Sequence, residues 1–261
     1  MTAMASVAVQ GLHVDFPIYH GNSRSLKQTV LQAAKTRAAQ GLHAGRLHHD
    51  SRNRVIVQAL RDVNFQLRSG ERLGLVGVNG AGKTTLLRVL AGIYEPVRGR
   101  VAVEGTVGAL LDPNLGMNSD LTGRENIALR GLYSGMPRTA IRALEDDVQE
   151  FSDLGEFLDL PVRFYSSGMV VRLGFALATA IHSQVLIMDE WLLAGDASFM
   201  QRAQARLGGM VQGAEILVLS SHMPTVIENW CTRALWMDQG RVRMDGTPGD
   251  VLAAYGAALA A

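Results

Sequence analysis

The segment that most constrains the fold is glycine-rich and carries the letters GVNGAGKT at residues 77–84. It follows a short apolar run, ERLGLVGV at 71–78, which is typical of a strand buried on both faces. It leads directly into a helical pattern, NGAGKTTLLRVLAGI at 79–93. A strand, a tight glycine-rich turn and a helix in this order aim the N–H groups of the turn and of the helix N-terminus at one spot, which attracts an anion.

The same segment fits the pattern G-x-x-x-x-G-K-[ST], in which lysine places a charge on the β- and γ-phosphates of a nucleotide and the hydroxyl binds Mg²⁺. Lys83 and Thr84 take these roles here. A glycine-rich turn with no ligand is the structural alternative, and the strand before and the helix after argue against it. The residues predicted to bind ATP in this loop are Gly77, Val78, Asn79, Gly80, Ala81, Gly82, Lys83, Thr84 and Thr85.

A second apolar run, residues 185–188, ends in two carboxylates, Asp189 and Glu190. A strand beside the phosphate-loop strand would bring Asp189 near Mg²⁺, with water between them. Glu190 would then face the γ-phosphate as the catalytic base that polarises the attacking water. A strand followed by a solvated acidic turn is the alternative, and it weakens because a phosphate loop is also present.

The remaining pattern is that of an α/β protein. Strands are expected at 5–18, 55–68, 101–103, 107–111 and 216–219, and a hairpin at 235–237 and 241–244. Residues 25–40 predict a basic amphipathic helix, residues 41–54 a loop, and residues 115–180 mostly helix. Strands alternating with helices predict a mainly parallel sheet, with a helical insertion before residue 185.

Composition narrows the class of partner. The 261 residues carry a net charge of +1, so bulk charge does not predict nucleic-acid binding. The single cysteine, Cys231, cannot form an internal disulfide, and no apolar run approaches the length of a membrane span. The N-terminus has no signal-peptide pattern. A role at a membrane would therefore require binding to another protein chain that spans it.

The segment YSSGMVVRL at 165–173 places small hydroxyl residues and a glycine before a helix, which makes a second anion-binding helix N-terminus. Here the chain resembles the ABC ATPases, whose signature LSGGQ aligns with residues 165–169 and is followed by an arginine, here Arg172. The resemblance implies that the residues of this motif bind the γ-phosphate held by a second copy of the chain in a head-to-tail dimer: Ser166, Ser167, Gly168 and Met169.

The resemblance also assigns residues outside the two loops. Asp196 lies where the family has its D-loop, His222 is similar in place to the switch histidine at the γ-phosphate, and Phe16 (or its competitor Tyr19) lies where the family stacks an aromatic ring on adenine. The glutamine that touches Mg²⁺ in most relatives is missing. Asp112 or Asn114 could replace it as a metal contact.

The resemblance implies a P-loop NTPase of RecA-like fold, with a mainly parallel sheet, an antiparallel β subdomain and an inserted helical subdomain. One ABC ATPase domain would cover residues 1–261, with a nucleotide-binding core at 1–111 and 181–261 and the helical subdomain at 112–180. The 25–40 helix would be an extra element, either packed on the ATPase or facing a membrane or anionic substrate.

The segments LTGREN at 121–126, YSSGM at 165–169 and GTPGD at 246–250 are most similar to those of polysaccharide exporters. This implies an ATPase at the cytoplasmic face of the inner membrane. Its partners would be a dimeric permease and a lipid-linked polysaccharide of the O-antigen, capsule or teichoic acid type. The alternatives are an exporter of another lipid or a drug, or a soluble ABC ATPase acting on DNA or ribosomes. A small-molecule P-loop kinase would lack YSSGM.

Overall fold

The computed structural model describes residues 4–17, 46–49, 55–111, 116–189 and 197–260. By contacts within the chain, it divides into two compact units, one made of residues 1–105 and 215–261 and the other of residues 106–214. The subdomain boundaries expected from the sequence lie elsewhere, near residues 111 and 181, and stay a prediction. The predicted helix at 25–40 lies outside the described residues.

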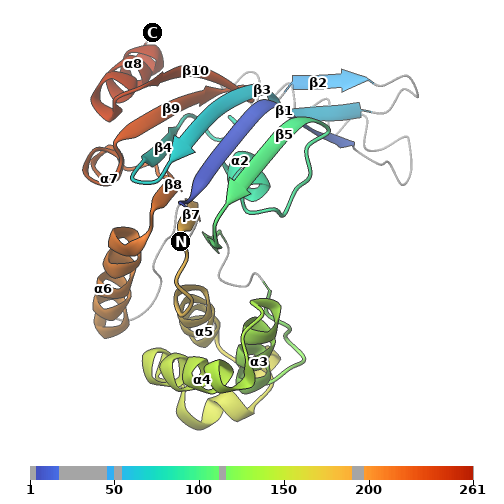
Figure 1. Ribbon diagram of the computed structural model, residues 1–261, viewed down its shortest axis with the longest axis vertical. Coiled ribbons are helices and arrows are strands. Elements are labelled where there is room, and N and C mark those ends of the chain that lie inside the picture. The colour runs from blue at the N-terminus through green and yellow to red at the C-terminus, as the bar shows by residue number, and fades with distance from the viewer. Residues whose placement is uncertain (1–3, 18–45, 50–54, 112–115, 190–196, 261) are drawn as a thin grey trace. The chain divides into compact units, whose positions relative to one another are not determined.

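The first unit contains a four-stranded antiparallel sheet in the order β2-β3-β1-β5 (Figure 1). Its long strands confirm the predictions for 5–18 and 55–68. On β1, alternate residues such as Val7, Val9 and Val14 are buried, as a strand with one face on a core requires. The strands are β1 (Ser6–Pro17), β2 (Arg46–His49), β3 (Val55–Arg68) and β5 (Arg98–Glu104).

The loop predicted for 41–54 is wrong at residues 46–49, which form β2. This strand pairs antiparallel with β3, so that Leu47 lies opposite Val57. Its sequence, RLHH, has no alternating apolar pattern. Pairing with the edge of β3 accounts for the strand, and such pairing has no signature in a short polar sequence.

The same unit contains four further strands in the order β10-β9-β4-β8. Strand β4 pairs in parallel with both β8 and β9, whereas β9 and β10 form the predicted hairpin. Its turn residues Gln239 and Gly240 both have positive φ, +47° and +78°, which is the conformation that two-residue hairpin turns favour. The strands are β4 (Arg72–Val76), β8 (Ile216–Ser220), β9 (Arg233–Asp238) and β10 (Arg241–Gly246).

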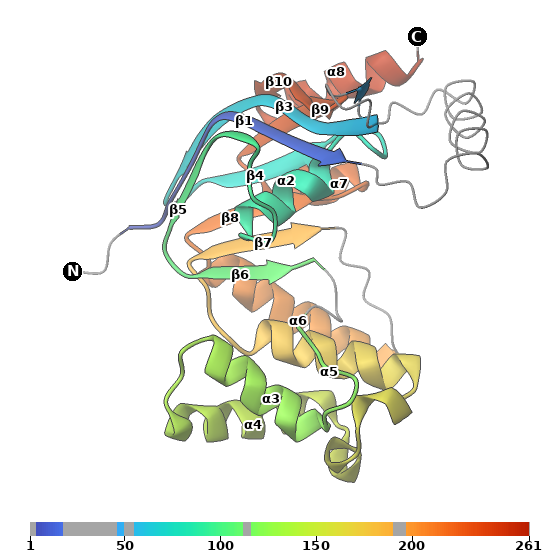
Figure 2. The same cartoon turned by 90° about the vertical axis from the view of Figure 1, so that its right-hand side faces the viewer.

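Helix α2 (Lys83–Leu90) lies between the antiparallel sheet and β8 (Figure 2), and it contacts β3, β5 and β8. Leu86, Leu87, Val89 and Leu90 are buried there. The C-terminal helix α8 (Pro248–Ala260) packs on β4, β9 and β10, and on α7 (Pro224–Trp230). The helix that follows the phosphate loop is therefore packed between two sheets.

The second unit holds two parallel strands and a helical bundle. Its apolar core gathers side chains of α3, α4 and α5, among them Ile127, Val148 and Leu173. This confirms the mostly helical prediction for 115–180. No helix among the described residues is both long and apolar enough to span a bilayer. The elements are β6 (Val107–Leu110), α3 (Gly123–Tyr133), α4 (Arg138–Ser152), η1 (Gly155–Asp159), η2 (Val162–Phe164), α5 (Ser167–Thr179), β7 (Val185–Asp189) and α6 (Ala197–Gly213).

Candidate functional site

The glycines of the phosphate loop have backbone conformations that other residues rarely adopt. The φ angles are +149° at Gly77, +86° at Gly80 and +107° at Gly82. A Cβ on Gly77 would lie 2.3 Å from the carbonyl oxygen of Met237 in β9. The loop therefore needs glycine both for its dihedral angles and for its close approach to the neighbouring strand.

Lys83, the first residue of α2, is 6% exposed. Its Nζ donates hydrogen bonds to the carbonyl oxygens of Gly77, at 2.7 Å, and Val78, at 3.3 Å. The loop is thus wrapped around an ammonium group, at a helix N-terminus whose own N–H groups also favour an anion. The geometry supplies the positive charge and the N–H donors that a bound phosphate needs.

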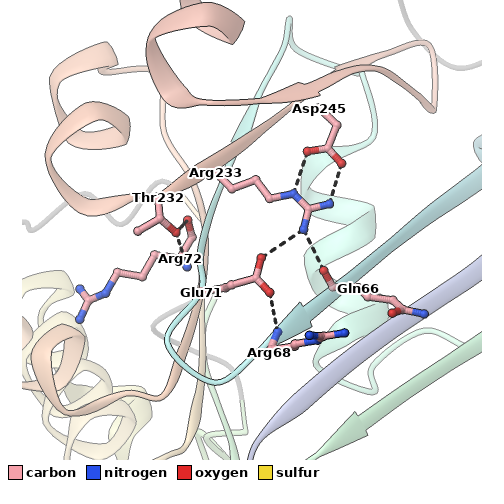
Figure 3. A network of polar contacts seen from close by, with 7 residues as sticks. All are labelled: Gln66, Arg68, Glu71, Arg72, Thr232, Arg233 and Asp245. Atoms are coloured by element: carbon pink, nitrogen blue, oxygen red, sulfur yellow. Dashed lines mark hydrogen bonds and ion pairs between the residues drawn. The ribbon is translucent and has the colours of Figure 1, made fainter.

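A network of polar contacts holds the start of β4, the strand that leads into the loop (Figure 3). The guanidinium of Arg233 makes two hydrogen bonds to Asp245, at 2.7 and 2.6 Å, and a third to Glu71 at 3.2 Å. Its hydrogen bonds to Asp245 raise the pKa of Arg233 above its ordinary value. Next to it, Arg72 donates its backbone N–H to Thr232 at 3.1 Å. The network ties β4 to β9 and β10 at the end of the strand remote from the loop.

His222 lies at the same edge of the parallel strands as the loop. Leu75 of β4 lies opposite Ser220 of β8 in a parallel pair, and Gly77 and His222 each follow two residues later. His222 is exposed in the turn before α7. The structure thus brings the predicted switch histidine and the phosphate loop to one edge of the first unit.

Asp189 ends β7 in the second unit and is half-buried. The residue before it, Met188, lies opposite Leu110 of β6, so the two strands end together. The segment with Asp112 and Asn114 follows β6 and lies outside the described residues, as do Glu190 and Asp196. The roles predicted for these residues stay predictions.

The predicted signature residues 165–169, the signature turn, open α5 in the second unit. Ser166 is the N-cap residue, and its Oγ accepts a hydrogen bond from the N–H of Met169 at 3.3 Å. Ser166, Ser167 and Gly168 are all exposed. A capped helix N-terminus with exposed small residues can approach an anion on another molecule closely.

Phe16, the predicted adenine partner, is half-buried and packs edge-on against Tyr94, with ring centroids 5.2 Å apart. Tyr94 also accepts a hydrogen bond from Arg88 of α2 at 3.0 Å. No motif of the sequence marks Tyr94. Its only signal was an aromatic residue shortly after the loop helix. Tyr19 lies outside the described residues, and adenine stacking stays a prediction.

A sequence model of the ABC transporter family matches residues 60–193. The chain is 40% identical over 233 residues to an O-antigen export system ATP-binding protein of Myxococcus xanthus, covering 89% of this chain and 53% of the relative. It is 36% identical to one of Yersinia enterocolitica, covering 92% of this chain and 97% of the relative. It is 37% identical to a teichoic acids export ATP-binding protein of Lactococcus lactis, covering 79% of this chain and 44% of the relative.

Solved structures agree on the fold. A structure titled as the ATP-binding subunit of an ABC transporter superposes with a TM-score of 0.65 at 21% identity, covering 96% of this chain and 93% of that one. A dimeric ATP-binding cassette with ADP and Pi gives 0.63 at 17% identity, covering 93% and 98%. These confirm the predicted P-loop NTPase fold. The chain belongs to the ABC transporter family.

Proposed function

We propose that this chain is the ATP-hydrolysing motor of an ABC exporter that moves a lipid-linked polysaccharide across the inner membrane. The observation that carries the proposal is the glycine loop folded around buried Lys83 in a chain similar to O-antigen export proteins along its length. The chain would act from the cytoplasmic face, bound to a dimeric permease. The alternatives are export of another lipid or a drug, and work away from membranes.

The loop fits a magnesium-bound triphosphate. Lys83 already holds two carbonyl oxygens, and its ammonium would turn to the β- and γ-phosphates, where it keeps an oxygen partner. Thr84 is exposed at the start of α2, where its hydroxyl would hold Mg²⁺, and Thr85 follows it. Asp189 would hold the ion through water. When bound, Mg²⁺ neutralises the charge that develops on the transferred phosphoryl group.

The chain's own residues position the reacting water. Glu190 would accept its hydrogen bond and orient it toward the γ-phosphate, since such a transfer depends on position and charge more than on covalent chemistry. His222 would donate a hydrogen bond to the same phosphate from the edge that carries the loop. In this proposal Lys83, Glu190 and His222 are the catalytic residues.

A second copy of the chain would complete the site. The signature turn, in which Ser166, Ser167 and Gly168 are exposed, would bind the γ-phosphate held by the other copy, and Asp196 would touch that copy. ATP then joins the two copies, and hydrolysis releases them. The different affinities of the open and closed pair for ATP would drive the permease.

The catalytic part of the proposal is tested with Glu190→Gln. This variant should bind MgATP and pair, but turn over at least about a hundredfold more slowly, as expected when a positioned base is removed. Glu150→Gln, on the exposed face of α4, is the matched control and should keep wild-type turnover. Wild-type turnover in Glu190→Gln would disprove the role of Glu190.

The substrate is tested with the permease in proteoliposomes. Lipid-linked polysaccharide added on the ATP side should stimulate hydrolysis and appear in the lumen. A drug or a phospholipid that does so in its place would favour the other exporter class. A chain that binds no permease would favour a role away from membranes.

A further inference from the structure

Asn126, in the first turn of α3, is a polar side chain buried in the second unit, where it is 2% exposed. Its Nδ2 donates to the carbonyl oxygens of Asn118, at 3.0 Å, Leu121, at 3.3 Å, and Thr122, at 2.8 Å. Its Oδ1 accepts from the N–H of Asn118 at 2.8 Å. One side chain therefore fixes both ends of the loop 118–122. It is the last residue of the LTGREN segment, which the proposed catalysis does not use.

The loop 118–122 is also fixed where it enters α3. Thr122 accepts a hydrogen bond from the N–H of Glu125 at 3.1 Å, and the Glu125 carboxylate accepts one from the N–H of Thr122 at 2.8 Å. This reciprocal capping box satisfies two backbone donors at the start of the helix. The loop thus has little freedom of its own while Asn126 is in place.

The held loop supports the segment that leads to the signature turn. The N–H of Val162 donates to the carbonyl of Leu121 at 3.0 Å, and the N–H of Arg163 to that of Ser119 at 2.9 Å. Thr122 and Pro161 form an isolated antiparallel bridge. The carbonyl of Leu121 therefore accepts from both Asn126 and Val162, which links the two segments through one atom.

Tyr165, the first residue of the signature turn, packs on the same helix start. Its hydroxyl donates to the carbonyl of Phe157 at 2.7 Å. A Cβ on Gly123 would lie 2.5 Å from that hydroxyl, so α3 needs a glycine there. Burial raises the pKa of Tyr165 above its ordinary value. Ser166 follows directly, as the cap of α5.

We infer that Asn126 is a positioning residue for the signature turn. It holds the loop 118–122, which holds residues 161–165 and so sets where Ser166 presents its hydroxyl. The inference rests on the proposed function, in which Ser166 grips the nucleotide bound by a second copy. Loss of Asn126 should leave nucleotide binding by the phosphate loop unchanged and weaken the pairing of two copies.

The test compares Asn126→Asp with the wild-type chain. Aspartate has nearly the same shape, but it removes the donors to three carbonyls and places a carboxylate among them. Dimerisation is measured by sedimentation, once with MgATP and once with a nonhydrolysable ATP analogue. The dissociation constant of the dimer should rise about tenfold or more. Binding of a fluorescent ATP analogue to dilute, unpaired protein should change less than about twofold. In steady state, kcat should fall with KM nearly constant.

Val211→Ala is the matched stability control, because Val211 is buried in α6 of the same unit and lies outside the core cluster next to Asn126. When each variant is measured at the same interval below its own melting temperature, two copies of Asn126→Asp should bind each other much more weakly than two copies of Val211→Ala. Equal pairing of the two variants would overturn the inference, because Asn126 would then serve stability alone.

Two further variants separate the ways in which the idea can fail. If Asn126→Asp does not fold, Thr122→Ala loosens the same loop from its partly exposed side, and wild-type pairing in that variant would overturn the inference. Ser166→Ala tests the proposed function itself. If Ser166→Ala pairs like wild type, the grip in trans is wrong and the role of Asn126 falls with it. If only Ser166→Ala fails to pair, the proposed function stands and the positioning role is wrong.

Discussion

Comparison of Gly82→Ala with Gly92→Ala should separate the two reasons for glycine in the phosphate loop, which are its backbone dihedral angles and its close approach to a neighbouring strand. Gly82 has φ +107°, and an added Cβ would lie 2.8 Å from the carbonyl oxygen of Ala59 and 2.9 Å from Cδ2 of Leu60. Such a backbone conformation costs a residue with a side chain about 1–3 kcal/mol. The carbonyl belongs to β3, so relief of the contact requires a shift of the loop, which we set at about a further 1–2 kcal/mol.

Gly92→Ala is the matched control at the other end of α2. Gly92 has φ +72°, but an added Cβ would meet open space, with no atom of the described residues within 4 Å beyond its immediate chain neighbours. The substitution should cost about 1 kcal/mol, from the backbone alone. Both variants are measured by urea unfolding and by equilibrium binding of a fluorescent ATP analogue.

The cost of the substitution should divide between the free energy of unfolding and the free energy of ATP binding. A loop that keeps its shape is strained, which lowers stability, and a loop that shifts binds phosphate poorly. For Gly82→Ala, the losses in unfolding free energy and in binding free energy should total about 2–5 kcal/mol. For Gly92→Ala the affinity should stay at the wild-type value. Since about 1.4 kcal/mol is tenfold in affinity, the two variants are easily told apart. Equal totals for Gly82→Ala and Gly92→Ala would refute the reasoning.

Lys83→Met should stay folded but bind the ATP analogue at least about tenfold more weakly, because the phosphates lose a charged donor. Burial raises the pKa of Cys231 to about 12, so iodoacetamide at about pH 8 should label it only in urea. Because that pKa lies above the unfolded value of about 8.5, stability should fall as pH rises from about 8.5 toward 12, and less so in Cys231→Ala. Neutralising Lys27, Lys35 and Arg37 together should lower export and spare the ATPase of the isolated chain; unchanged export would reject a membrane or substrate role for the segment 25–40, which is predicted to be helical.

The elements predicted correctly from the sequence are those whose conformation depends on residues close together in the chain. The strand at 185–188 extends only to Asp189, and the hairpin turns at Gln239 and Gly240 as predicted, because apolar runs and turn residues act locally. The glycine-rich loop was also readable, since its dihedral angles depend on its own residues. Strand β2 was not, because its partner β3 supplies the reason for its conformation.

The sequence predicted which residues belong to the candidate site, but not how they are placed relative to one another. The sequence placed His222 after a strand, and only the parallel register of β4 and β8 brings it to the edge that carries Gly77. Tyr94 was not predicted as the partner of Phe16, because the two residues lie far apart in the sequence and only the fold brings their rings together.

The LTGREN and YSSGM segments show what a pattern cannot express. Each was specific as a string, yet nothing in either string says that the two touch. In the structure, Gly123 leaves room for the Tyr165 hydroxyl, and Asn126 shares an acceptor with the segment that precedes Ser166. The two segments therefore pack on each other, and a Cβ at 123 would meet the Tyr165 hydroxyl at 2.5 Å and Cδ2 of Leu158 at 2.7 Å. Gly123→Ala should thus be tolerated better beside Tyr165→Phe, which removes the nearer of these atoms. The contact with Leu158 remains, so the melting temperature should be restored only in part.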